Sequence, residues 1–288
     1  MLEKLLDSIF ACSINRQLVS KADIIVVDND AQCTARETVE GKSIPDPVFF
    51  SLQYGSNPAK GITNVRNDLL SRADAFNPDF IVFVDDDEWV TEQWLNELVR
   101  TITERNADAA MGPVLPVFEK PLPDYVACWF NRESHEDQSK IDAIKTGNLI
   151  LRASKLRELK LRFDSRFNIT GSSDTYFGIQ LQKSGSEIYW AAKAIAYETV
   201  PASRATMSWV IKRVYRGAST YTYMLKLEKK WGALIRKFFV SILYIFIGLI
   251  TSVLVIVPFR KRYWGILKLV NGVGGITGLG NLLYNEYK

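Results

Sequence analysis

Three adjacent aspartates, Asp85, Asp86 and Asp87, are the residues of this 288-residue sequence that most clearly suggest chemistry. They follow the apolar run FIVFV at 80–84, which is typical of a buried strand. Carboxylates this close repel one another, and keeping them ionised near an interior is costly unless a cation binds there. Oxygen-only ligands favour Mg²⁺ or Mn²⁺, completed by substrate phosphates. A solvated strand-to-helix junction needs one N-capping aspartate and does not explain three.

The segments around these aspartates alternate between helical and strand patterns. A helix is predicted over Leu2–Phe10, a buried strand at 24–27 ending in Asp28, a helix over 62–75 and a helix over 92–102. Such alternation predicts an α/β fold with a mostly parallel sheet and helices on both faces. Because ligands bind beyond the carboxyl ends of such strands, Asp28 and the three aspartates are expected on one rim.

Further along, residues 147–151 are predicted to form a strand and 174–181 a short helix. The polar segment Cys128–Lys140 contains the single histidine, His135, and is predicted to be a mobile loop over the site.

Composition excludes two classes of site. The net charge of +4 is mild, and acidic and basic residues are interspersed up to about residue 200, which argues against nucleic-acid binding. Cys12, Cys33 and Cys128 lack C-x-x-C spacing and there is one histidine, so a zinc site is not expected. These cysteines fit a reduced cytoplasmic compartment, and the amphipathic start does not resemble a signal peptide.

The C-terminal part is basic and apolar. Phe238–Phe259 carries no charge and is long enough to cross a bilayer, whereas burial in a soluble core would be unusual for such a helix. Basic residues flank it on both sides, and Tyr263–Tyr284 is apolar but interrupted by Lys268. A hairpin, an in-plane helix and a short second span remain alternatives. We expect a catalytic domain over 1–205 and membrane-associating helices over 206–288.

The strand followed by Asp-x-Asp resembles the nucleotide motif of family 2 glycosyltransferases with the GT-A fold. The resemblance implies that Asp28 contacts the nucleotide base, and that Asp85 meets the ribose while Asp87 binds the metal. Asp86 would support the nucleotide site. Asn57, followed by Gly61 and the helix carrying Arg66, resembles a second nucleotide-binding segment of that family.

Three later segments extend the resemblance. The run TGNL at 146–149 implies that Gly147 and Asn148 border the donor sugar and acceptor. The segment around Asp174 resembles the one carrying the catalytic base, although Ser173 replaces the usual glutamate. The segment 197–216 is most similar to bacterial exopolysaccharide glycosyltransferases of the succinoglycan type, which implies further donor or acceptor contacts: Glu198, Trp209, Arg213 and Arg216.

The resemblance implies an inverting transfer of sugar from a nucleotide-diphospho-sugar, a UDP-sugar, to a saccharide or lipid-linked saccharide in cell-surface polysaccharide synthesis. Asp174 would take the proton from the acceptor hydroxyl. The expected location is the cytoplasmic face of the bacterial inner membrane, with the C-terminal apolar segment associating with the membrane.

Alternatives remain at three points. Family members begin with a strand that this sequence lacks, so either the given start is too late or the product is a truncated, non-catalytic binding subunit. A phosphatase of the haloacid dehalogenase type also begins its site with Asp-x-Asp, but Trp89 occupies a position where a small residue is usual. Arg213 and Arg216 fit either a diphosphate or lipid headgroups.

Overall fold

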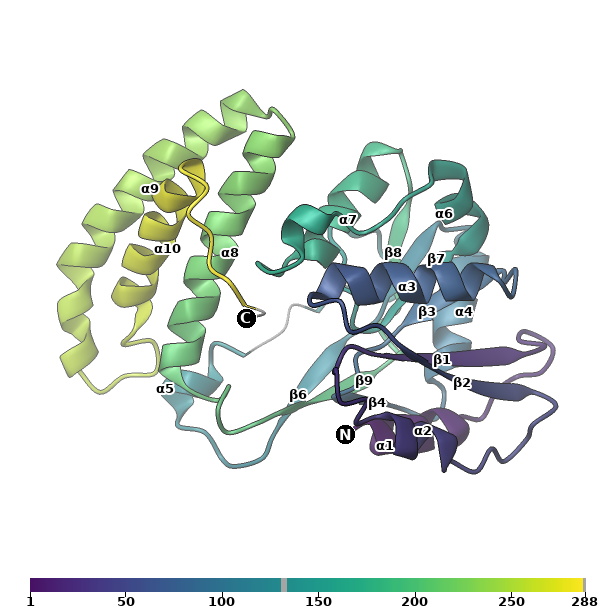
Figure 1. Ribbon diagram of the computed structural model, residues 1–288. Coiled ribbons are helices and arrows are strands. Elements are labelled where there is room, and N and C mark those ends of the chain that lie inside the picture. Colours follow the sequence, from purple (N-terminus) through teal and green to yellow (C-terminus); the bar gives the residue numbers. More distant parts are fainter. Residues whose placement is uncertain (131–133, 287–288) are drawn as a thin grey trace. The chain divides into compact units, whose positions relative to one another are not determined.

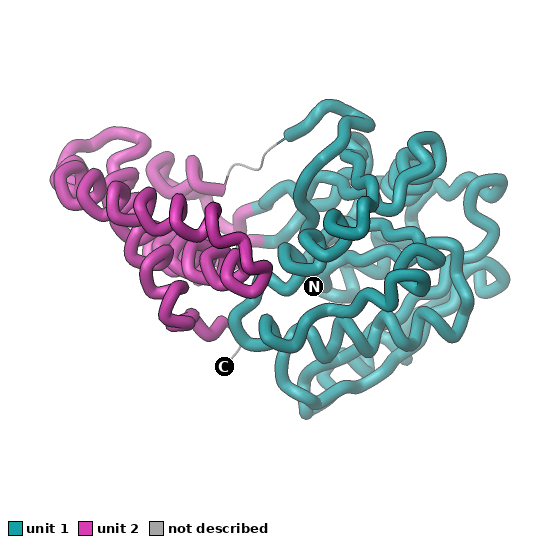
Figure 2. The backbone as a smooth tube through the Cα atoms, turned by 90° about the horizontal axis from the view of Figure 1, so that it is seen from above, with its two compact units in different colours: residues 1–117, 132–199, 287 teal, residues 118–131, 200–286, 288 magenta. Residues whose placement is uncertain are grey.

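The computed structural model describes residues 1–130 and 134–286 (Figure 1). The chain divides into two compact units (Figure 2). The first contains residues 1–117 and the described part of 132–199, and the second contains the described part of 118–131 together with 200–286. The second unit therefore joins a segment from the middle of the chain to a C-terminal part that starts at Val200. The division at 205/206 between a catalytic domain and membrane-associating helices stays a prediction.

The first unit alternates helices and strands in the predicted order. Its helices are α1 (Leu2–Phe10), α2 (Arg36–Glu40), α3 (Ile62–Asp74), α4 (Trp94–Glu104), α6 (Ala153–Leu159), the 3₁₀ turn η1 (Ser165–Phe167) and α7 (Ser173–Lys183). Its strands are β1 (Ala22–Asp28), β2 (Phe50–Ser56), β3 (Phe80–Phe83), β4 (Glu88–Val90), β5 (Ala109–Met111), β6 (Val114–Phe118), β7 (Leu149–Arg152), β8 (Ile188–Trp190) and β9 (Ala196–Val200).

The strands form three sheets, and their directions are mixed. β1 and β2 pair in parallel, a four-stranded sheet has the order β3-β7-β5-β8, and a three-stranded sheet has the order β4-β9-β6. β5 and β8 pair in parallel, β7 runs antiparallel to β3 and β5, and β4 runs antiparallel to β9. In the four-stranded sheet, therefore, β7 alone runs against the other three strands. A strand buried on both faces is an apolar run whether it pairs in parallel or antiparallel. The pattern therefore predicted the strands but not the direction of their pairing.

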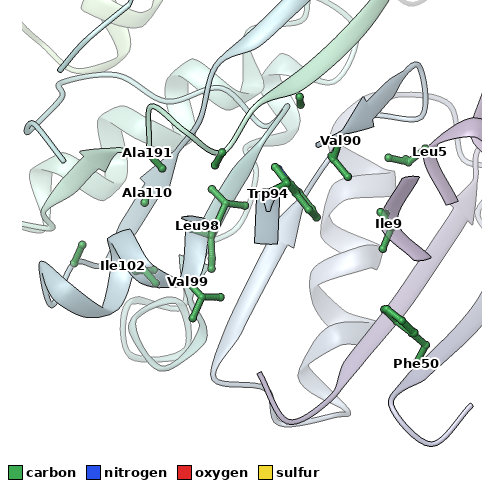
Figure 3. Packing of buried hydrophobic residues seen from close by; sticks show 14 of the residues in the cluster. Leu5, Ile9, Phe50, Val90, Trp94, Leu98, Val99, Ile102, Ala110 and Ala191 are labelled. Carbon is green, nitrogen blue, oxygen red and sulfur yellow. The ribbon is translucent and has the colours of Figure 1, made fainter. Parts of the chain in front are cut away.

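Helix α4 forms the core beside the central sheet. Trp94, Leu98 and Ile102 recur at helical spacing and are almost completely buried. Figure 3 shows these side chains along α4, close to Ala110 and Ala191. Burying each large side chain contributes about 1.5–3 kcal/mol, so this cluster fixes the sheet whose strand β3 leads to the three aspartates.

The second unit consists mainly of three long helices. They are α8 (Met207–Leu227), α9 (Trp231–Thr251), which continues into the 3₁₀ segment η2 (Ser252–Ile256), and α10 (Trp264–Leu279), with the short α5 (Asp124–Ala127) beside them. α8 begins where the Thr206 side chain accepts a hydrogen bond from the Trp209 N–H, a normal N-cap. Among the described residues, 231–256 is the one helical stretch long and apolar enough to cross a membrane.

Candidate active site

The three aspartates occupy a tight turn between β3 and β4. The Glu88 N–H donates to the Asp85 carbonyl at 3.1 Å, and the Asp85 N–H donates to Glu88 Oε2 at 3.2 Å. On the other side, the Thr199 N–H of β9 donates to the Asp87 carbonyl at 3.0 Å. The backbone of the turn is therefore fixed from both sides, while the Asp85 and Asp86 side chains remain accessible.

Glu88 is a further residue of the candidate site, and the sequence did not suggest it. Only 3% of it is exposed, and this burial, reinforced by neighbouring carboxylates, raises the pKa of its side chain to about 9. Glu88 is therefore protonated at neutral pH in the absence of a cation. The burial of Glu88 could have been predicted from strand alternation, because Glu88 and Val90 point to the buried side of β4 while Trp89 points to the other side.

Arg66 of α3 joins the aspartate turn to the segment that carries Asp174. Its guanidinium lies 3.9 Å from Asp85 Oδ1 and donates to Ser173 Oγ at 2.8 Å. Burial among protein atoms and repulsion by nearby carboxylates, Asp174 included, raise the pKa of Asp85 to about 6, while Arg66 opposes the rise. Because 48% of the Asp85 side chain is exposed, water screens part of the repulsion.

Asp174 lies in the first turn of α7, half-buried, and is not the helix cap. Ser172 occupies the N-cap position with a left-handed φ of 64°, and Asp174 Oδ1 accepts the Thr175 N–H at 2.8 Å. An acidic side chain is favourable at a helix N-terminus. The predicted base and the predicted metal ligands are thus close enough for their charges to interact.

Gly147 and Asn148 have different roles in this structure. A Cβ at position 147 would lie 2.4 Å from Glu88 Oε1 and 3.5 Å from Asp85 Oδ2, so only glycine fits against the carboxyl cluster. Asn148 is completely buried. Its Oδ1 accepts from Trp94 at 2.7 Å, and its Nδ2 donates to the carbonyls of Pro113 and Ala194 at 2.9 and 2.6 Å.

Asn148 was expected to contact the donor or acceptor, and the structure instead uses its side-chain amide inside the fold. The sequence could not show this, because the groups that satisfy the amide come from three distant segments. We therefore leave Asn148 out of the proposed site.

Asp28 and Asn57 organise the loops that follow β1 and β2. Asp28 is buried, and its carboxylate accepts the N–H groups of Asp30 and Ala35 at 2.8 and 2.9 Å and the Tyr54 hydroxyl at 3.3 Å. The Asn57 N–H donates to the Asp28 carbonyl at 2.8 Å, which links the two loops.

The loop after Asn57 is fastened to the segment preceding Asp174. Gly61 has a φ of 115°, and any Cβ there would overlap the Asn168 amide. Asn168 Oδ1 accepts from the Thr63 N–H and hydroxyl at 3.0 and 2.7 Å, and its Nδ2 donates to the Lys60 carbonyl at 2.9 Å. The predicted nucleotide loops and the predicted base are joined through these contacts.

The remaining predicted residues lie in two places. Glu198 lies opposite Glu88 in the β4–β9 register and adds to the negative charge around it. Trp209, Arg213 and Arg216 belong to the second unit, where they line a cavity of about 170 Å³. Arg213 lies over the Trp209 ring, and Arg216 pairs with Glu286 at 2.5 Å.

The predicted loop Cys128–Lys140 includes residues 131–133, which lie outside the described part of the chain. Its later residues are tied to β8, since the Gln138 N–H donates to the Trp190 carbonyl at 2.7 Å and Lys140 forms a bridge with Tyr189. Exposed His135 lies against the Trp190 ring.

The donor set fits a hard divalent cation that is shared with a substrate. In residues 1–130 and 134–286, no three histidine, cysteine or acidic side chains converge into a ready-made metal cage. Mg²⁺ characteristically takes one or two protein carboxylates and completes its shell with phosphates and water. Burial, together with the neighbouring carboxylates, raises the pKa of Asp85, and a bound cation would favour its ionised form.

Comparison with solved structures defines the class of fold. The chain resembles Staphylococcus aureus TarS residues 1–349 in complex with UDP, with a TM-score of 0.53 and 14% identity over 99% of this chain and 89% of the other. It also resembles GalNAc-T7 with UDP, GalNAc and Mn²⁺, with a TM-score of 0.50 and 11% identity over 76% of this chain and 47% of the other. The fold is of the GT-A type, as predicted.

Sequence comparison gives the family. The profile described as glycosyl transferase family 2 matches residues 2–160. The succinoglycan biosynthesis protein ExoM of Rhizobium meliloti is 32% identical over 212 residues, which is 73% of this chain and 66% of ExoM. The chain belongs to glycosyltransferase family 2, which confirms the predicted resemblance.

The buried carboxyl group of Glu88 predicts a pH-dependent stability. Its pKa is raised in the folded chain, so the folded state binds a proton that the unfolded state releases above its ordinary pKa of 4.5. Stability should therefore fall as the pH rises from 5 towards 9, by at most about 1.4 kcal/mol per pH unit in the absence of divalent cations.

Thermal unfolding of wild type and Glu88→Gln in EDTA at pH 5.5, 7 and 8.5 tests this. As the pH rises from 5.5 to 8.5, the melting temperature of Glu88→Gln should fall less than that of wild type. Parallel curves for the two proteins would show that Glu88 is not held protonated.

Proposed function

We propose that this chain transfers a sugar from a nucleotide-diphospho-sugar, a UDP-sugar, to a saccharide or lipid-linked saccharide acceptor in cell-surface polysaccharide synthesis. The observation that carries the proposal is the cluster formed by the Asp85–Asp87 turn, Arg66 and Asp174 in a member of family 2. The matched relative is named for succinoglycan biosynthesis, and a related fold has been solved with UDP-GlcNAc.

The donor side of the proposed site is built from acidic turns and one arginine. Asp87 and Asp85 would hold Mg²⁺ or Mn²⁺, and the cation would offset the charge that develops on the departing nucleoside diphosphate. Asp85 also faces the ribose, and Asp86 supports the nucleotide. Arg66, fixed between Asp85 and Ser173, contributes positive charge near the diphosphate.

The loops after β1 and β2 would receive the base. The Asp28 carboxylate accepts hydrogen bonds from two backbone N–H groups and a tyrosine hydroxyl. We therefore infer that Asp28 both holds the loop that forms the base pocket and contacts the base. Asn57 holds the neighbouring loop in place through its side-chain bond to the Ala59 N–H.

Asp174 is the proposed catalytic base. It would accept the proton of the acceptor hydroxyl as that oxygen attacks the anomeric carbon and the bond to the diphosphate breaks. One displacement of this kind inverts the anomeric centre. Gly147 would leave room for the sugar beside the carboxyl cluster, and Glu198 would lie at its margin.

The C-terminal region 206–288 would associate with the membrane, on its cytoplasmic face, while 1–205 carries the chemistry. Support comes from the apolar stretch 231–256, in which few residues are buried. In this arrangement Trp209, Arg213 and Arg216 would meet a diphosphate or the phosphates of lipid headgroups. An acceptor attached to a lipid would be presented at the same surface.

The metal assignment predicts unequal effects within the aspartate turn. Asp87→Ala should reduce Mn²⁺-dependent transfer by about a thousandfold, because a lost metal contact removes charge stabilisation from the transition state. Asp86→Ala, a matched removal of the neighbouring exposed carboxylate, should cost no more than about tenfold. Transfer from a panel of UDP-sugars is measured with circular dichroism as the check on folding. Full activity of Asp87→Ala would contradict the assignment.

The base assignment predicts a loss of turnover without a loss of donor binding. Asp174→Asn keeps the shape and the contact with the Thr175 N–H but cannot accept a proton, so kcat should fall by about a hundredfold or more. UDP binding, measured by calorimetry with Mn²⁺, should be nearly unchanged. Wild-type chain that binds UDP tightly without turning over any donor would instead support the non-catalytic binding subunit.

A further inference from the structure

We propose that the second unit lies flat on an anionic phospholipid surface, with the outward face of α9 in one leaflet and both ends of α9 on the same side. This extends the proposed membrane association, which by itself allows a spanning helix, a hairpin or an in-plane helix.

The outward face of α9 and η2 is apolar and lacks a protein partner in the described part of its unit. Phe246 is 61% exposed and Ile250 is 75% exposed, although side chains of this type normally avoid water. Other large apolar side chains continue this face: Ile235, Phe239, Leu243, Leu249, Val253 and Ile256. The inward positions Leu234, Ser241 and Gly248 recur every seven residues and are buried.

Helix α10 lies between α9 and α8, as Figure 1 shows. It runs antiparallel to α9, because Gly265 packs against Thr251 and Gly272 against Ser241. On its other side, α10 follows α8 in parallel, since Gly274 packs against Tyr215 and Gly278 against Ser219. The Lys226 ammonium group of α8 donates to the Leu279 carbonyl at the end of α10. The three helices therefore lie side by side along most of their lengths.

This arrangement argues against a spanning α9. If α9 crossed the bilayer, α8 would be carried into it lengthwise, with exposed Lys212 and Arg213 and the partly buried Arg216. Charged side chains at such depth are strongly disfavoured. α10 has 16 residues and is about 24 Å long, shorter than a hydrocarbon core of about 30 Å. Lying flat, the unit places the apolar face of α9 in lipid and the charged face of α8 towards water.

The charge of the region indicates which surface it meets. Residues 229–285 contain no aspartate or glutamate and eight lysines and arginines. The cations gather on both sides of the uncharged run 238–259, with Lys229, Lys230, Arg236 and Lys237 before it and Arg260, Lys261 and Arg262 after it. Each basic cluster is attracted to anionic headgroups, and basic flanks stay on the cytoplasmic side. An in-plane helix places both basic clusters at the anionic headgroups of the cytoplasmic leaflet, whereas a spanning helix places only one of them there.

Cysteine accessibility tests the orientation in the full chain. In a Cys12→Ser, Cys33→Ser, Cys128→Ser background, Lys230→Cys and Lys261→Cys place one thiol at each exposed end of the apolar stretch. Both should react with a membrane-impermeant maleimide in the same preparation, either inside-out or right-side-out membrane vesicles. Reaction in opposite preparations would overturn the proposal in favour of a spanning helix.

Vesicle binding tests the surface itself. Purified chain should sediment with phosphatidylcholine vesicles containing phosphatidylglycerol, and less with phosphatidylcholine alone. Phe246→Glu/Ile250→Glu should weaken binding about tenfold or more, because it places charge on the lipid-facing side. The matched control Leu18→Glu/Val48→Glu alters two exposed apolar residues of the first unit and should bind as wild type does.

Equal vesicle binding by the α9 variant and the control would overturn the proposal. UDP binding by each protein, measured separately, reports on the first unit. A wild-type chain that binds vesicles but neither binds nor consumes UDP-sugars would count against the proposed transferase function and leave the membrane inference standing.

Discussion

The repulsion among carboxylates at one turn is the constraint on which the candidate site of the first unit depends. Asp85, Asp86 and Asp87 lie on the surface side of the turn, and Glu88 lies beneath them. The protein tolerates this because Glu88 is protonated, Arg66 faces Asp85, and backbone bonds from β4 and β9 fix the turn. In the proposed function, a cation held together with a diphosphate would complete this compensation.

Much of this could be predicted from the sequence, for a physical reason. Apolar runs of four or five residues predicted the strands at Asp28 and Asp85, and helical spacing predicted α1, α3 and α4, because these patterns express local burial. The glycosyltransferase motifs lie at the ends of those elements, so their approximate positions followed.

What could not be predicted depends on contacts between distant segments. The antiparallel direction of β7 depends on the path taken through 112–148, which carries no periodic signal. The internal role of Asn148 depends on Trp94 and two carbonyls, and the protonated state of Glu88 depends on its burial beneath its neighbours. Local sequence does not encode such partners.

The contact between Gly61 and Asn168 has a consequence for how this enzyme family can diverge. The amide of Asn168 occupies the space where a side chain at position 61 would be, and it also bonds the backbone at Lys60 and Thr63. Neither position can change freely unless the other changes too. Across related sequences, residues 57–63 and 165–168 should therefore covary and exchange as a matched pair, so that a transplanted 57–63 loop would fold correctly only with its own partner segment.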